Sequence, residues 1–90
     1  MSTSADELRA WFERGELTGK RYMVVATDTF DYEDYPIYTD APVAEVERLR
    51  AQPMTKVMEV YDLRKRFDAR RRVWDLPEKD PEPGGGDTQR

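Results

Sequence analysis

The sequence of 90 residues contains neither cysteine nor histidine. Without cysteine, disulfides and thiolate metal ligands are excluded, so a chain of this size is held together by packing or by self-association. Without histidine, the commonest general base and the commonest metal ligand are missing, which leaves carboxylates, lysine, tyrosine, serine and threonine for any chemistry. Most hydrolases and transferases do not work with that set. The composition therefore favours a non-enzymatic protein without a cofactor.

Long apolar runs are also missing. No run approaches the roughly 20 residues that a membrane helix needs, and the first residues, MSTSADELRAW, lack the basic-then-apolar order of a secretory signal. We therefore expect a cytoplasmic protein without a membrane partner.

Charge is unevenly distributed along the chain. The net charge of -4 combines thirteen acids and seven bases in residues 1–63, six bases and one acid in 64–74, and an acidic excess in 75–90. Opposed surface potentials of this kind bear on partners and on association rates rather than on the fold.

The N-terminal part predicts a helix over about 5–14. Ser4 and Glu7 have the spacing of a capping box, in which two side chains satisfy backbone amides at a helix start. Gly15 then ends the apolar pattern. The apolar stripe, which we expect in the core, consists of Leu8, Trp11 and Phe12.

Two strands and a hairpin follow. The run 22–26, YMVVA, is short and rich in β-branched residues, which is typical of a central strand covered on both faces. Pro36 cannot donate a backbone hydrogen bond, so the segment 35–39 fits an edge strand. The hairpin between them would have its tip at 31–34, in solvent.

The second half predicts a helix, a strand and a helix. Asp40 can cap a helix that ends before Pro53, and the alternating segment 56–63 is typical of a strand. The apolar residues of 64–76 return to helical spacing. Beyond them, residues 77–90 are rich in proline, glycine and charge, which predicts a disordered acidic tail.

Together these elements predict an α+β fold of the order α-β-β-α-β-α, with helices packed on a small three-stranded sheet. A single domain spans 1–76. The two strands that flank the second helix are expected to form a right-handed parallel unit, provided that they belong to one sheet.

The strings VVATDTFDYEDYPIYTD and KVMEVYDLRKRFD resemble a family of short bacterial and phage-borne proteins of no known activity, with a DTFD-x-EDYP-x-Y segment and a later VMEVYDL strand. The similarity covers about residues 8–67. It implies no substrate or cofactor, and it carries over no functional residues. It does imply that 28–38 and 57–63 define the domain, and it suggests a phage or mobile-element context.

Carboxylates invite two chemical interpretations. Asp28, Asp31, Glu33 and Asp34 offer hard oxygens for calcium or magnesium, and Asp62 could approach them from another strand. Their spacing does not match the calcium-loop pattern, so a solvated acidic turn is favoured and no metal ligand is assigned.

Asp28 and Asp62 could instead form an acid–base pair if their strands are neighbours. The alternative is that both accept hydrogen bonds from turns or pair with arginine, and no catalytic residue is assigned.

The most informative segment is 28–40, DTFDYEDYPIYTD, which interleaves five acids with four aromatic residues. Tyrosine is enriched at protein-binding hot spots, so we expect this segment to recognise a protein partner with a basic surface. The candidate partner-binding residues are Asp31, Tyr32, Glu33, Asp34, Tyr35 and Tyr38. For the last two, packing in the core is an equal alternative, whereas Tyr32 should lie at the hairpin tip.

The alternative function is nucleic-acid binding by the arginine-rich last helix, whose side chains could follow phosphates. The residues concerned are Arg66, Arg70, Arg71 and Arg72. The acidic balance of the whole chain disfavours this function, because an acidic hairpin repels a polyanion. The arginines would then cover apolar surface and pair with acids.

Two further expectations concern partners. A three-stranded sheet leaves an edge to cover, and the segregated charges suit head-to-tail contact, so we expect a homodimer or another homo-oligomer. In a phage context, an acidic inhibitor that occupies the nucleic-acid groove of a host nucleic-acid-binding or defence complex would fit the charge pattern.

Overall fold

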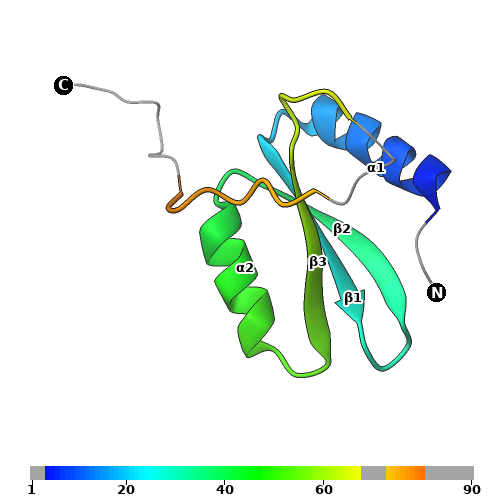
Figure 1. Cartoon of the computed structure of the whole chain (residues 1–90), viewed down its shortest axis with the longest axis vertical. Coiled ribbons are helices and arrows are strands. Elements are labelled where there is room, and N and C mark those ends of the chain that lie inside the picture. Colours follow the sequence, from blue (N-terminus) through cyan, green and yellow to red (C-terminus); the bar gives the residue numbers. More distant parts are fainter. Residues whose placement is uncertain (1–3, 68–72, 81–90) are drawn as a thin grey trace.

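The computed structural model describes residues 4–67 and 73–80 of the chain (Figure 1). Five elements follow one another: α1 (Ala5–Thr18), β1 (Tyr22–Asp28), β2 (Glu33–Thr39), α2 (Pro42–Ala51) and β3 (Thr55–Asp62). The predicted α+β class is confirmed, with the order α-β-β-α-β.

The sheet has the strand order β2-β1-β3, and β1 runs antiparallel to both neighbours. β2 and β3 therefore run in the same direction, with β1 between them. The predicted crossover through α2 joins two strands of one sheet, but these strands do not pair with each other. The central position of 22–26 and the edge position of the strand that contains Pro36 are both confirmed.

The two helices pack on opposite faces of the sheet. Because successive residues of a strand point to opposite faces, β1 contributes to both clusters, and each residue from Tyr22 to Ala26 is buried. The α1 face consists of Phe12, Met23, Val25, Tyr61 and Leu63. The α2 face consists of Tyr22, Val24, Ala26, Val46, Leu49 and Val60. Among the residues that the structure describes, neither helix has the length and apolar character needed to cross a membrane.

β3 does not keep the strict alternation that the sequence predicted. Val25 pairs with Glu59 but Ala26 pairs with Val57, so one extra residue of β3, Met58, forms an irregularity of the bulge type. On the two sides of the bulge, odd-numbered side chains of β3 therefore point to opposite faces of the sheet, and so do even-numbered ones. Val57 consequently packs on the α2 face together with Val60, while Met58 packs on the α1 face.

α1 continues past Gly15, where the sequence predicted its end. Gly15 is buried within the helix, and a Cβ atom added to it would lie 2.8 Å from Cε1 of Tyr38 and 3.0 Å from the methyl carbons of Leu63. This glycine therefore allows α1 to approach the sheet closely. The helix ends before Gly19, whose φ of 80° is the left-handed conformation common after a helix C-terminus.

The predicted helix over 64–76 is absent from the described residues of that range. Residues 64–67 form a turn, and residues 73–76 are extended; 68–72 lie outside the described residues. The chain bends at Glu78 and Lys79 and reaches Asp80, so the described start of the predicted tail contacts the domain (orange in Figure 1). We call residues 73–80 the C-terminal strap. The rest of the predicted tail, 81–90, lies outside the described residues.

The C-terminal strap begins as a short parallel partner of β3. The amide of Val60 donates to the carbonyl of Val73 at 3.1 Å, and the amide of Asp75 donates to the carbonyl of Val60 at 2.8 Å. The Asp75 carboxylate also accepts a hydrogen bond from the amide of Asp62 at 3.0 Å. The strap thus occupies part of the outer edge of β3.

The strap ends at the N-terminus of α2. The carboxylate of Asp80 accepts hydrogen bonds from the amides of Val43 at 2.6 Å and Ala44 at 3.0 Å. The predicted cap, Asp40, accepts instead from the amide of Arg21 at 3.0 Å. Asp80 therefore takes the role that an N-cap side chain usually plays, from a distant part of the chain.

Replacing Gly15 with Val should lower the free energy of unfolding by about 2 kcal/mol, because a branched side chain has no room against the Tyr38 ring and Leu63. Leu17→Val, at a position of α1 that is 89% exposed, is the control and should cost about 0.5 kcal/mol or less. Urea unfolding followed by tryptophan fluorescence measures both. Equal stabilities of the two variants would contradict the close approach of α1.

Replacing Asp80 with Ala should destabilise the protein by about 1 kcal/mol, because two amides at the start of α2 lose their acceptor. Asp80→Asn keeps a side-chain oxygen and should retain most of the stability. Thermal unfolding followed by circular dichroism compares the variants. An Ala variant as stable as the parent protein would show that Asp80 does not cap α2 in solution.

Candidate functional site

The connection between β1 and β2 is a four-residue loop, Thr29–Tyr32. Asp28 pairs with Glu33 across its base. The amide of Tyr32 donates to the carbonyl of Asp28 at 2.6 Å, and the amide of Phe30 donates to the Asp28 carboxylate at 2.8 Å. The tip therefore lies two residues earlier than the predicted 31–34, and Asp28 organises its backbone.

Two aromatic rings project from this loop. Phe30 is 70% exposed and Tyr32 is 67% exposed. Tyr32 also has a φ of 57°, in the left-handed region, which costs a residue with a side chain roughly 1–2 kcal/mol. Gly or Asn would fit this backbone more easily. The loop thus holds a large ring in solvent at a position where the fold favours a small or flexible residue.

The predicted acidic residues divide into two groups. Asp31 and Glu33 are exposed, and none of the ion pairs between residues in the described ranges involves them. Asp34 is half-buried, and its carboxylate accepts a hydrogen bond from the Thr27 hydroxyl across the β1–β2 ladder. Asp31 and Glu33 consequently place negative charge beside the exposed rings.

The two remaining candidate tyrosines pack against the core. Tyr35 packs against the α2 face. Tyr38 packs under α1, and its hydroxyl donates to the carbonyl of Trp11 at 2.7 Å. Burial raises the pKa of the Tyr38 phenol, although the charge of Arg14 opposes the effect. Both rings therefore help to hold the domain together, as the core alternative anticipated.

The structure separates Asp28 and Asp62, the two carboxylates that were considered as an acid–base pair. In the antiparallel register, Asp28 pairs with Thr55 while Asp62 pairs with Tyr22. Six residues of strand, or about 20 Å, lie between the two acids. An acid–base pair of Asp28 and Asp62 is therefore wrong. Nor do three or more acidic side chains converge as possible metal ligands anywhere in the described part of the chain.

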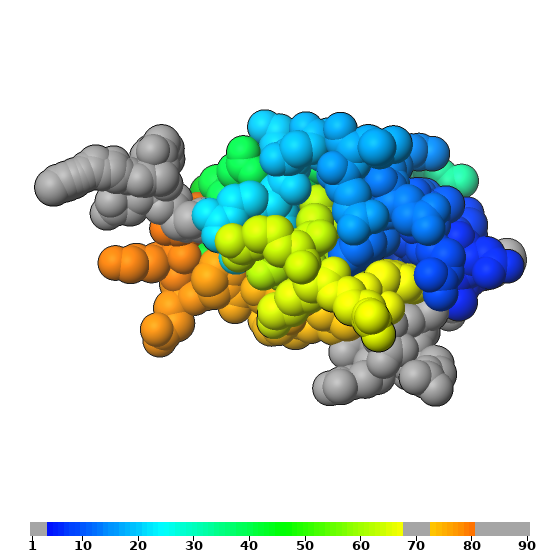
Figure 2. Space-filling view, turned by 90° about the horizontal axis from the view of Figure 1, so that it is seen from above, coloured from blue at the N-terminus to red at the C-terminus, as the bar shows by residue number. Residues whose placement is uncertain are grey.

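The opposite end of β3 carries a basic turn, residues 64–66, which lies close to α1 (Figure 2). The Arg64 guanidinium pairs with Asp62 at 3.2 Å, and Lys65 pairs with Asp75 at 3.2 Å. Arg66 is exposed. The other residues proposed for nucleic-acid binding, Arg70, Arg71 and Arg72, lie outside the described residues.

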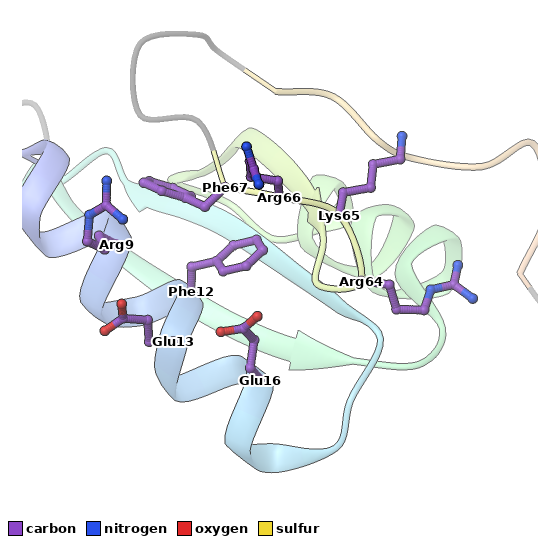
Figure 3. A pocket seen from close by; sticks show the side chains of 8 residues that line it. All are labelled: Arg9, Phe12, Glu13, Glu16, Arg64, Lys65, Arg66 and Phe67. Atoms are coloured by element: carbon purple, nitrogen blue, oxygen red, sulfur yellow. The ribbon is translucent and has the colours of Figure 1, made fainter.

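A shallow pocket of about 460 Å³ lies between this turn and α1 (Figure 3). The Arg9 guanidinium lies over the Phe67 ring, 5.2 Å from its centre, and Phe12 packs against the same ring at 5.3 Å. Glu13 and Glu16 line the α1 side. The Phe67 ring, packed against Phe12 and Arg9, holds this segment against α1. The charged residues around it do not form a constellation that fits a known reaction.

Sequence reasoning missed two exposed apolar residues at the loop end of the sheet. Phe30 was not among the predicted site residues, yet its side chain is 70% exposed. Met54, between α2 and β3, is 60% exposed and was not considered. A partial signal exists for Phe30, since Asp two residues before it can accept from its amide and form an Asx turn.

Comparisons with protein-family models, with curated proteins and with solved structures find no significant match to this chain.

Acidification should weaken the fold through Asp62. Burial would raise the pKa of this carboxyl, but hydrogen bonds from Arg64 and the charges of Arg64 and Lys65 hold it below its usual value. The ionised carboxylate therefore stabilises the folded protein above about pH 4, and this contribution is lost as the pH falls through the lower folded-state pKa.

Replacing Asp62 with Asn tests this linkage. The variant should be about 1–3 kcal/mol less stable than the parent protein at neutral pH, because it loses charged hydrogen bonds with Arg64. The difference should shrink below about pH 4. Urea unfolding across the acidic range measures it. A difference that stays constant with pH would contradict the assigned role.

Proposed function

We propose that the protein is a non-enzymatic binding protein that recognises a protein partner through the β1–β2 loop. Phe30 and Tyr32 supply the apolar anchors, and Asp31 and Glu33 supply the charge that selects a basic partner surface. The observation that carries the proposal is the exposed ring of Tyr32 at a left-handed φ. Strained backbone that presents a bulky side chain to solvent is typical of recognition sites rather than of stabilising turns.

The loop is organised before any partner arrives. Hydrogen bonds from the amides of Phe30 and Tyr32 to Asp28 fix its backbone, and β2 returns directly to the buried strand β1. A preorganised loop loses little conformational entropy when it binds. Aromatic rings with few rotatable bonds add contact area at a similarly low cost.

The charge around the loop favours a basic partner. Asp31 and Glu33 lie at one end of the sheet, while the bases of the turn 64–66 lie at the other end of β3. Such a separation steers association with a positively charged surface and disfavours a polyanion at the loop. A nucleic-acid-binding or defence complex of a host cell is one partner of this kind, in keeping with the resemblance to phage-borne proteins.

Replacing Tyr32 with Asn tests the proposal. Asparagine tolerates the left-handed φ, so the stability of the variant should equal or exceed that of the parent protein. Partner binding should fall roughly tenfold or more, because an aromatic anchor is lost. Affinity capture from the native host, followed by quantitative mass spectrometry, measures partner recovery, and urea unfolding measures stability.

A charge variant and a control complete the experiment. Asp31→Asn combined with Glu33→Gln should slow association and reduce its dependence on salt. Leu17→Asn removes an exposed apolar side chain from α1 and should leave capture unchanged. Undiminished capture by the Tyr32→Asn variant would refute the proposal. Salt-sensitive oligonucleotide binding that Arg66→Ala reduces would favour nucleic-acid recognition instead.

A further inference from the structure

The connection between α2 and β3 lies beside the β1–β2 loop at the same end of the sheet (Figure 1). The amide of Thr29 donates to the carbonyl of Met54 at 2.9 Å, which ties the two loops together. The antiparallel register agrees, since Asp28 at the end of β1 pairs with Thr55 at the start of β3. The backbones of the two loops therefore adjoin one another.

Met54 shares the unusual geometry of Tyr32. Its φ is 58° beside the 57° of Tyr32, and these two are the non-glycine residues with a positive φ in the part of the chain that the structure describes. Each carries a large apolar side chain that is at least 60% exposed. A left-handed φ costs energy at both positions, and both side chains are largely exposed.

We infer that the two loops form one recognition surface, the two-loop patch, and that its occupant is a cationic amphipathic segment of the partner. The patch consists of Phe30, Asp31, Tyr32, Glu33 and Met54. The inference rests on the proposed function and adds to it a second loop and the chemistry of the bound segment.

The occupant follows from what the patch offers. Phe30, Tyr32 and Met54 present apolar surface that a row of aliphatic or aromatic side chains can cover, and the flexible Met54 adapts to the shape of that row. Asp31 and Glu33 lie next to the rings and can accept hydrogen bonds from lysine or arginine beside the row. An apolar stripe flanked by bases is the pattern of a basic amphipathic helix, which is commonly bound by apolar surfaces rich in methionine.

A second copy of the chain is a poorer occupant. Its basic turn would have to bind the patch, but Arg64 is already paired with Asp62 and Lys65 with Asp75. The adjoining Phe67 ring packs between Arg9 and Phe12. Docking this turn on the patch would therefore break contacts within the subunit.

The inference can be tested with two synthetic peptides of the same leucine pattern. One carries lysine and the other glutamate at the polar positions. Titrated into the full chain, the leucine–lysine peptide should shift amide NMR signals of residues 29–33 and 53–55, and the leucine–glutamate peptide should not. Three outcomes would overturn the inference: equal shifts with both peptides, shifts only at residues outside the two-loop patch, or no shifts. Self-association that uses the same residues, seen by sedimentation, would overturn it too.

Met54→Asn separates this inference from the proposed function. Asparagine fits the left-handed φ, so stability should be retained, while affinity for the leucine–lysine peptide should fall roughly tenfold. Leu17→Asn is the matched control: it should leave the peptide affinity unchanged and lower stability only slightly, because asparagine is a weaker helix former than leucine. If Tyr32→Asn lowers partner capture from the host but Met54→Asn changes neither capture nor peptide affinity, the proposed function stands and the two-loop patch is wrong. If neither variant affects capture, both fail.

Discussion

The burial of β1 is the constraint on which the rest of the structure depends. Its residues Tyr22–Ala26 are covered on both faces and paired on both edges, so a single short strand joins α1, α2, β2 and β3 into one core. The other buried residues, among them Phe12, Val46, Leu49 and Val60, pack against the two faces of this strand or beside it. The same strand determines where the loops lie, because β1 ends beside both the start of β2 and the start of β3. The proposed recognition surface therefore adjoins the end of the buried central strand, although its own side chains are largely exposed.

The C-terminal strap changes the argument for self-association. A three-stranded sheet has two outer edges, and Trp74 pairs with Val60 to occupy part of the β3 edge within the subunit. Among the described strands, the edge of β2 and the rest of the β3 edge stay unpaired, and Pro36 in the middle of β2 has no backbone donor. A homodimer remains a proposal, but an uncovered edge supports it less than the sequence alone suggested.

Local signals predicted the elements whose cause is local. The Ser4 hydroxyl does accept from the Glu7 amide, and the run of β1 is the central strand. The sequence-based predictions are wrong where a contact with a distant segment determines the local conformation. Gly15 remains helical because the sheet needs a residue without a side chain there. Trp74 has helical spacing in the sequence, yet its segment pairs with the edge of β3 instead of forming a helix. The pairing shift at Met58 and the cap supplied by Asp80 likewise depend on partners far along the chain, which periodicity cannot reveal.

The loop residues show a second reason why the sequence alone could not identify all the candidate site residues. The sequence predicted a binding surface in the acidic and aromatic segment and placed Tyr32 at the hairpin tip, but it left core and interface as equal alternatives for Tyr38. The register makes the distinction: Tyr38 lies opposite Met23 under α1, whereas Tyr32 lies beyond the last pair of the ladder. Met54 carried no compositional signal at all, and only its backbone angle and its contact with Thr29 connect it to the same surface. Tyr32 and Met54 combine a strained backbone with side chains that stay at least 60% exposed in the isolated chain. The simplest physical reason for them is an interaction that buries them when a partner binds.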